Sequence, residues 1–210
     1  MDLNNIVSTY LDQNKKKRRF LQTVDLIVNI KGYDFSKQEN RANFDIRLPN
    51  GRGSKKFNIV IFADDTNIVQ AANKLNATVI DGKSISQMQN DKQKLKLLLN
   101  RYTISLAQPN LLPVIARALG PVLGPKGKLP KPIAGNLEAA VTNAINTVSI
   151  KSKGKYIPTL QCAVGTEDME SNKIVENIDA VLDAIIKKYG RNNIKSVYIK
   201  LTMAEPLRIM

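Results

Sequence analysis

The sequence predicts a two-domain protein of the α/β class, and three observations support this prediction. Residues 57–63 (FNIVIFA) are almost all apolar, which is typical of a strand covered on both faces in a parallel sheet. From this strand to residue 145, strand-like and helix-like segments alternate, as they do in parallel α/β domains. The flanking segments contain strands of alternating polarity instead. We therefore interpret residues 52–146 as a domain inserted into a first domain, which is built from residues 1–51 and 147–210.

The N-terminal flank is expected to contain one helix and two strands. Residues 2–13 carry apolar side chains at helical spacing. Residues 22–30 (QTVDLIVNI) alternate apolar and polar positions and predict a half-buried strand. Residues 44–53 (FDIRLPNGRG) predict a strand that ends in a turn, because Asn50-Gly51 is a strong turn signal.

The middle block is expected to repeat a strand–helix unit, which gives a parallel sheet. A helix should follow the first strand and run to about residue 75. The later elements expected are a strand at 77–81, a helix from Ser84 to near Leu99, a strand at 102–108 and helices at 109–119 and 136–145. Asp64 and Asp65 follow the first strand. A metal site is one interpretation of this pair, but adjacent acids at that place are more typical of a helix N-terminus.

Residues 118–132 (ALGPVLGPKGKLPKP) are expected to form an irregular loop, because neither a helix nor a strand accommodates so many glycines and prolines. A phosphate-binding P-loop is disfavoured, since Gly127-Lys128 lacks the glycine five residues earlier and the following Ser or Thr. A plain connector and a rigid cationic surface remain open. In the second interpretation Lys126, Lys128 and Lys131 supply sequence-independent attraction to phosphate.

The C-terminal third is expected to return to strands. Residues 145–152 and 155–164 predict two strands joined at Lys153-Gly154. The next segment carries an apolar helical stripe with acids before it, lysines at its end and a glycine beyond, which are the signals of a complete helix. Residues 196–203 (SVYIKLTM) predict the final strand.

Composition excludes several kinds of chemistry. The chain has no histidine and one cysteine, so imidazole catalysis, histidine metal ligands, a cysteine zinc cluster and an internal disulfide are excluded. The segment after the first strand of the middle block lacks the glycine fingerprint of a nucleotide-binding enzyme. Cys162 lies in the apolar run LQCAV and is expected to be a buried structural thiol. We expect no catalytic residue, metal or cofactor.

Charge and targeting signals bound the choice of partner. The chain has 32 Lys and Arg against 18 Asp and Glu, a net charge of +14. Such a balance favours nucleic acid as the partner, with an acidic membrane surface as the second candidate. No apolar run approaches the ~20 residues that a membrane-spanning helix needs, and no signal peptide is visible. A single cysteine fits a reducing cytoplasm.

Four blocks, in order along the chain, resemble one known family. They are RRFLQTVDLIVNIKGYD, NRANFDIRLPNGRG, LGPKGKLPKP and SVYIKLTMAEPLRI. In these blocks the chain resembles the universal large-subunit ribosomal protein L-one family, in its archaeal form. The blocks span nearly the whole chain, and it is their shared order that makes the resemblance specific.

The resemblance implies a split α+β domain that carries the main RNA site and an inserted Rossmann-like parallel α/β domain. It implies a non-enzymatic constituent of the large ribosomal subunit that binds large-subunit rRNA and forms the mobile stalk near the E site, where it assists release of deacylated tRNA. It also implies repression of the protein's own mRNA, a cytoplasmic location on the ribosome, no membrane partner and a monomer outside the ribosome. The alternative is a free-standing RNA-binding translational repressor that is not incorporated in the ribosome.

The family's RNA-binding positions can be carried over residue by residue. They fall on Arg19, Phe20, Thr23, Asp25, Arg41, Lys153, Thr202, Met203 and Ala204. Threonine hydroxyls can bond a ribose 2′-OH or a base edge, and arginine suits phosphate. The loop lysines Lys126, Lys128 and Lys131 would form a secondary cationic site. Where the family has a Thr-Met-Gly-Pro turn, this chain has Thr-Met-Ala-Glu-Pro, which adds a methyl group and a negative charge.

Plainer interpretations of three features stay open at this point. Phe20 could anchor the first strand in the core rather than face a partner. Thr202-Met203 could be an ordinary turn in which methionine fills a gap. The basic run KKKRR at 15–19 is, by itself, typical of a solvated charged segment.

Overall fold

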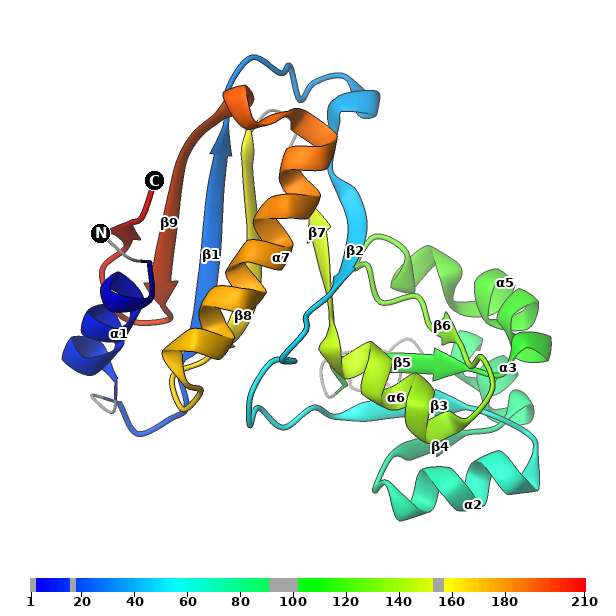
Figure 1. Ribbon diagram of the computed structural model, residues 1–210. Helices are drawn as coiled ribbons and strands as arrows, with labels where there is room; N and C mark the ends of the chain where they lie inside the picture. The colour runs from blue at the N-terminus through cyan, green and yellow to red at the C-terminus, as the bar shows by residue number, and fades with distance from the viewer. Residues whose placement is uncertain (1–2, 16–17, 91–101, 153–156) are drawn as a thin grey trace. The chain divides into compact units, whose positions relative to one another are not determined.

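The computed structural model describes residues 3–15, 18–90, 102–152 and 157–210 (Figure 1). Its backbone contacts divide the chain into two compact units. Unit 1 comprises Met1–Lys55 and Asn146–Met210, and unit 2 comprises Lys56–Ile145. Unit 1 contains an antiparallel sheet and unit 2 a parallel one, so the predicted mixed α/β class is confirmed.

Unit 1 is built around a four-stranded antiparallel sheet in the order β10-β9-β1-β8, with β2 and β7 paired separately. Its helices are α1 (Leu3–Asn14), α7 (Ser171–Tyr189) and the 3-10 turns η1 (Gln38–Asn40) and η3 (Arg191–Asn193). Its strands are β1 (Thr23–Ile30), β2 (Asn43–Arg47), β7 (Thr147–Lys151), β8 (Thr159–Thr166), β9 (Ile194–Leu201) and β10 (Leu207–Arg208).

The sheet of unit 1 buries one face, as the alternation in β1 predicts. Val24, Leu26, Val28 and Ile30 are each at most 2% exposed, while the residues between them are half-buried on the other face. The long helix α7 lies along the sheet in Figure 1, and apolar residues of α7 and α1 join the same core. Gly190 ends α7 with φ +83°, a conformation that glycine adopts without strain. The predicted glycine stop is therefore confirmed.

Unit 2 has three layers, of which the middle one is a parallel sheet in the order β4-β3-β5-β6. Its strands are β3 (Ile59–Phe62), β4 (Thr78–Ile80), β5 (Ile104–Ala107) and β6 (Lys131–Pro132). Its helices are α2 (Thr66–Lys74), α3 (Gly82–Asn90), η2 (Pro109–Leu111), α5 (Leu112–Leu123) and α6 (Leu137–Asn146). Residues of α3 and α5 pack in one apolar cluster with the sheet, and residues of α2 and α6 pack in a second.

The prediction of an irregular loop over 118–132 is wrong at both ends. Helix α5 continues through Gly120 and Pro121 to Leu123, four residues beyond its predicted end. Leu119 and Leu123 lie one helical turn apart and are at most 1% exposed, so their burial outweighs the cost of a proline within the helix. At the other end, β6 pairs with β5. The irregular part is confined to 124–130.

Two other boundaries differ from the prediction or lie outside the described residues. Helix α3 begins at Gly82 rather than Ser84, because the Asp81 side chain accepts a hydrogen bond from the Ser84 amide (3.1 Å) and satisfies the first turn. The end of this helix near Leu99 lies outside the described residues, as does the Lys153-Gly154 connection. The two strands that this connection joins have different partners, since β7 pairs with β2 and β8 pairs with β1.

Two predictions about single residues are confirmed. Asp65 caps α2 by accepting a hydrogen bond from the Asn67 amide (2.8 Å), and Asp64 accepts one from the Gly82 amide (2.7 Å) at the start of α3, so each acid serves a helix N-terminus. Cys162 is buried in the core of unit 1. Burial raises the pKa of its thiol to about 12, which leaves it protonated and unreactive at neutral pH.

Candidate nucleic-acid interface

The start of β1 and the end of β9 are joined by three hydrogen bonds between two threonines that lie 179 positions apart. The Thr23 amide donates to Thr202 Oγ1 (3.1 Å), and the Thr202 amide donates to the Thr23 carbonyl (3.1 Å). The Thr202 hydroxyl also donates to that carbonyl (3.4 Å). The two strands run antiparallel, so the start of β1 lies beside the end of β9. Two predicted site residues are thus brought together by the backbone.

Large apolar side chains stand in solvent beside this junction. Phe20 is 49% exposed, Met203 is 57% exposed, and Leu21, the chain neighbour of Phe20, is exposed as well. Phe20 therefore does not anchor β1 in the core. Arg18 and Arg19 precede it and are exposed as well. We call the set Arg19, Phe20, Thr23, Lys55, Thr202 and Met203 the strand-end surface.

Lys55 is the member of this surface that the sequence gives no signal for. Its ammonium group donates to the Thr23 hydroxyl (3.3 Å), and the side chain is otherwise exposed. The contact depends on the segment 52–55 lying close against the end of β8, which composition and spacing do not predict. Lys55 adds a positive charge where two strand ends already present hydroxyl groups.

Asp25 lies two residues along β1 from Thr23, on the same half-exposed face of the sheet. Its neighbours across the strands are Ala163 on β8 and Lys200 on β9. A carboxylate at this place borders the strand-end surface rather than forming its centre.

Arg41 is not brought to this surface. It follows η1, beyond the opposite end of β1, and its guanidinium donates to the carbonyls of Phe35 and Ser36 (3.0 Å each). The Arg41 carbonyl in turn accepts a hydrogen bond from Lys188 (2.7 Å). These contacts hold the 31–42 connection. Lys153, the other outlying position, falls outside the described residues.

The described residues contain neither a group of metal ligands nor a membrane-spanning helix. Within 3–15, 18–90, 102–152 and 157–210, no three His, Cys, Asp or Glu side chains gather as metal ligands would. Among the helices of those segments, none has the length and apolar content to cross a membrane.

Comparison with known proteins decides the family. The model of the ribosomal protein L1p/L10e family matches residues 11–205. The chain belongs to this family. Proteins named large ribosomal subunit protein uL1 are similar to it over nearly their whole length. The one from Methanothermobacter thermautotrophicus is 39% identical, covering 93% of this chain and 92% of that protein. The one from Thermococcus kodakarensis is 40% identical, covering 92% and 90%.

A third relative, from Methanocaldococcus jannaschii, is 37% identical over 92% of this chain and 89% of that protein. All three organisms carry the protein under the same name, and the predicted resemblance to the family's archaeal form is confirmed. L1 proteins are structural proteins, and this member of the family is not an enzyme.

The departure from the L1 turn at Ala204 is accommodated without strain. Among the described residues Asn76 alone has a positive φ outside glycine, so Ala204 keeps an ordinary backbone conformation. Its amide donates to the Leu201 carbonyl (3.1 Å), and its methyl group packs against the core. The Tyr10 hydroxyl donates to the Glu205 carbonyl (2.6 Å) and accepts from the Leu201 amide (3.1 Å). A side chain of α1 thus fixes the turn from behind.

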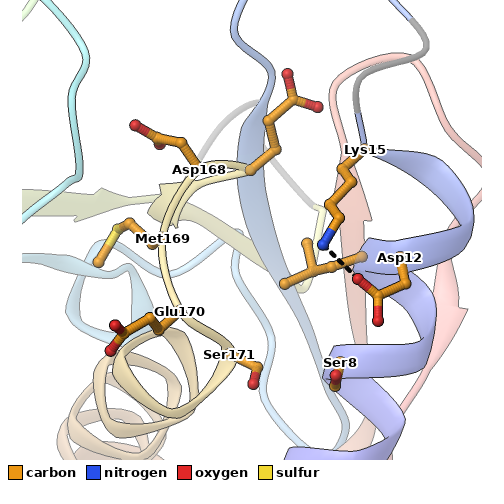
Figure 2. A pocket seen from close by; sticks show the side chains of 9 residues that line it. Ser8, Asp12, Lys15, Asp168, Met169, Glu170 and Ser171 are labelled. Carbon is orange, nitrogen blue, oxygen red and sulfur yellow. Dashed lines mark hydrogen bonds and ion pairs between the residues drawn. The ribbon is translucent and has the colours of Figure 1, made fainter.

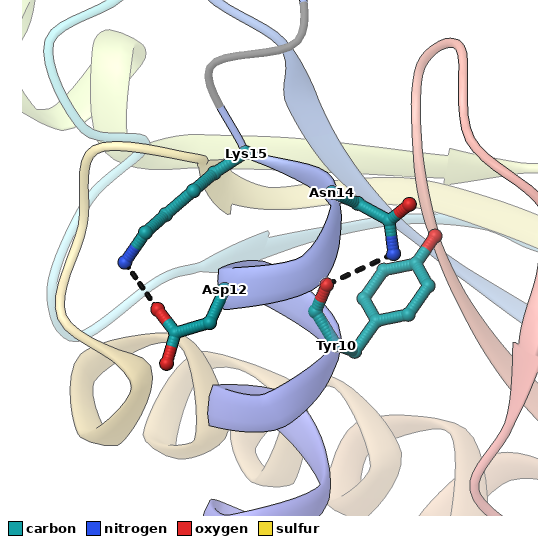
Figure 3. Close-up of polar contacts among 4 residues, drawn as sticks. All are labelled: Tyr10, Asp12, Asn14 and Lys15. Carbon is teal, nitrogen blue, oxygen red and sulfur yellow. Dashed lines mark hydrogen bonds and ion pairs between the residues drawn. The ribbon is translucent and has the colours of Figure 1, made fainter.

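Helix α1 is itself closed at its C-terminal end by local contacts. The Asn14 side chain donates to the Tyr10 carbonyl (3.0 Å), and Lys15 pairs with Asp12 (Figure 3). The Asn14 contact satisfies a carbonyl in the last turn of α1. The Tyr10 side chain, from the same part of α1, contacts the turn that follows β9.

An acidic hollow lies between α1 and the start of α7. It measures about 460 Å³ and is lined by Asp12, Glu167, Asp168 and Glu170, with Lys15 as its one cation (Figure 2). Burial raises the pKa of Asp168, but hydrogen bonds from Ser54 and Thr166 outweigh this and lower it overall, so Asp168 is ionised at neutral pH. The hollow repels a polyanion and marks a border of the strand-end surface.

The secondary cationic loop of unit 2 contains two kinds of lysine. Lys126 and Lys131 are exposed. Lys128 is half-buried: its ammonium donates to the Tyr102 carbonyl (2.9 Å) and lies 5.0 Å from the Tyr102 ring centroid, while its own carbonyl accepts from the Ser105 hydroxyl (3.1 Å). Lys128 therefore ties the loop to β5.

Replacing Lys128 by alanine is expected to destabilise unit 2 by about 1–2 kcal/mol, because a charged hydrogen bond and a cation–π contact are both lost. Hydrogen exchange at the β5 amides measures this directly. Lys126→Ala, which removes an exposed charge in the same loop, should change stability by less than about 0.5 kcal/mol. Equal effects of the two substitutions would contradict the structural role of Lys128.

Proposed function

We propose that this chain is a structural constituent of the large ribosomal subunit and binds large-subunit rRNA through the strand-end surface of unit 1. In this role it forms the mobile stalk near the E site and assists release of deacylated tRNA. It also binds its own mRNA and represses its translation. Family membership and the name shared by its relatives support the ribosomal role.

The two units have different roles in this proposal. The discontinuous domain, 1–51 with 147–210, carries the RNA contacts together with Lys55, which belongs to the same compact unit. The inserted Rossmann-like domain, 52–146, presents Lys126 and Lys131 as a secondary cationic edge toward tRNA or rRNA. The protein acts on the ribosome in the cytoplasm and is a monomer when free.

The observation that supports RNA binding most is the combination at the strand-end surface. Two threonines hold each other's backbone in place. Beside them, the large apolar side chains of Phe20 and Met203 are exposed next to arginine and lysine. Exposed aromatic and apolar side chains next to cations suit bases and sugars lying on a phosphate-binding edge. The net charge of +14 adds sequence-independent attraction to the same polyanion.

Lys55 provides a sharp test of which cations contact RNA. Lys55→Ala is expected to weaken binding to an rRNA fragment about 5-fold and to reduce the slope of log affinity against log salt by about one, as the loss of one phosphate contact does. Lys56→Ala is the matched control, because it removes the same charge from the next exposed residue. Equal losses from the two variants would mean that Lys55 acts only through total charge.

Ribosome association separates the proposal from a free-standing repressor. Large subunits from the source cells, washed at increasing salt, should retain about one copy of the protein, and the purified chain should rebind subunits depleted of it. A repressor that is not incorporated would bind its own messenger fragment and be absent from washed subunits. That second result would contradict the ribosomal role.

A further inference from the structure

Besides the contacts of Tyr10, the turn that carries Thr202 and Met203 is held from inside by the buried side chain of Gln22. Gln22 is only 1% exposed, although it stands between the exposed Leu21 and the half-buried Thr23. Its side-chain oxygen accepts a hydrogen bond from the Met203 amide (3.1 Å). Because that amide belongs to the strand-end surface, the contact links the core of unit 1 directly to the proposed RNA site.

Glu167 fixes the orientation of Gln22. The Gln22 side-chain nitrogen donates to Glu167 Oε2 (3.0 Å), and the Gln22 backbone amide donates to Glu167 Oε1 (3.1 Å). The Glu167 amide donates back to the Gln22 carbonyl (3.0 Å), and the Gln22 nitrogen also reaches the carbonyl of Asn14 (3.4 Å). Three segments distant in sequence, the end of α1, the end of β8 and the C-terminal turn, therefore meet on one amide group.

The side chain at this meeting point must both donate and accept a hydrogen bond. A carboxylate only accepts hydrogen bonds and a backbone N–H only donates, so the side chain between Glu167 and the Met203 amide must donate on one side and accept on the other. Glutamine does both. Glutamate at position 22 would place two carboxylates against each other, and alanine would leave the Met203 amide without its partner.

We propose that Gln22 is a positioning residue for the RNA site: it sets the conformation of the turn at 202–204, and Glu167 holds it in the orientation that this requires. The inference rests on the proposed RNA-binding function for its consequence, but the positioning itself can be measured without RNA. Gln22 touches no ligand in this account, and it acts through the Met203 amide.

The test exchanges the two side chains. In the full-length protein, Gln22→Glu should speed hydrogen exchange at the Met203 amide at least 10-fold and weaken binding to the stalk-base fragment of large-subunit rRNA by about 10-fold. Glu167→Gln should have a smaller effect in the same direction. The double variant Q22E/E167Q again pairs a donor with an acceptor and keeps the net charge of +14, so both quantities should return to within about 3-fold of wild type.

Two controls separate positioning from charge and from stability. Gln13→Glu adds the same negative charge on the exposed side of α1 and should leave Met203 exchange and RNA affinity unchanged. Ile185→Val removes a buried methyl group near the far end of α7 and lowers stability without touching the turn, so RNA affinity should hold.

The outcomes are distinguishable. Unchanged Met203 exchange in Q22E, or a double variant no better than Q22E, would overturn the positioning role even if the wild-type protein binds the fragment tightly. A wild-type protein that does not discriminate the fragment, but whose Met203 protection is lost in Q22E and restored in Q22E/E167Q, would reject the RNA-binding function and support the role of Gln22 in the turn.

Discussion

Replacing Asn177 by leucine should lower the free energy of unfolding of unit 1 by about 3 kcal/mol or more. Asn177 lies on α7 and is fully buried. Its side-chain nitrogen donates to the carbonyls of Gly51 (2.9 Å) and Val164 (2.7 Å), and its oxygen accepts from the Asn50 amide (3.0 Å). Leucine has a similar volume but removes the partner of two buried carbonyls, each costing about 1–3 kcal/mol, and of the part-buried Asn50 amide.

Native-state hydrogen exchange at the amides of β1 and β8 measures this effect within unit 1. Asn172→Leu makes the same chemical change at an exposed position of the same helix and should alter stability by less than about 0.5 kcal/mol. If the two leucine variants were equally stable, the turn at 50–51 would not depend on Asn177.

Gly53→Ala is the second substitution with a large expected effect, about 2–4 kcal/mol of destabilisation. Gly53 has φ +74°, and a Cβ atom there would lie 1.8 Å from Thr166 Oγ1 and 2.9 Å from Met169 Cγ. Thr166 is fully buried and its hydroxyl donates to the Asp168 carboxylate, so moving it aside would break that hydrogen bond. The left-handed backbone costs an L-residue about 1–2 kcal/mol, and the collision adds to it. Because Lys55 follows in the same segment, RNA affinity should fall as well.

Gly135→Ala separates the two costs. Gly135 also has a positive φ (+70°), but an added Cβ would meet nothing within 4 Å. This variant should show only the backbone cost, about 1–2 kcal/mol in unit 2. A Gly53→Ala protein no less stable than the Gly135→Ala protein, in urea unfolding followed by circular dichroism, would contradict the close packing of 52–55 on β8.

Periodicity was enough to predict the strands and helices that bury a single face. In β1 every apolar position of the alternating pattern is buried. The end of α5 was not predictable by the same means, because rules for glycine and proline act locally whereas Leu119 and Leu123 are held by contacts across unit 2.

The contacts of the strand-end surface could not be predicted from sequence patterns either, for a different reason. Thr23 and Thr202 are distant in sequence, and only the resemblance to a family placed them together. Gln22 is in phase with the buried positions of β1, and a polar side chain is accommodated there because Glu167 and the Met203 amide satisfy it. No sequence pattern predicts the contact between Lys55 and Thr23. Position in the chain predicts neither contact, since each depends on a partner from another element.

The central claim is that the strand-end surface is a specific RNA site. The measurement that tests it most directly is a salt titration of binding to the stalk-base fragment of large-subunit rRNA, beside a scrambled hairpin of equal length. A site with about five phosphate contacts should give a log–log slope of roughly −4, and the scrambled RNA should bind about 10³-fold more weakly. Equal and steeply salt-dependent binding to both RNAs would contradict the account, because the charge of +14 alone would then explain it.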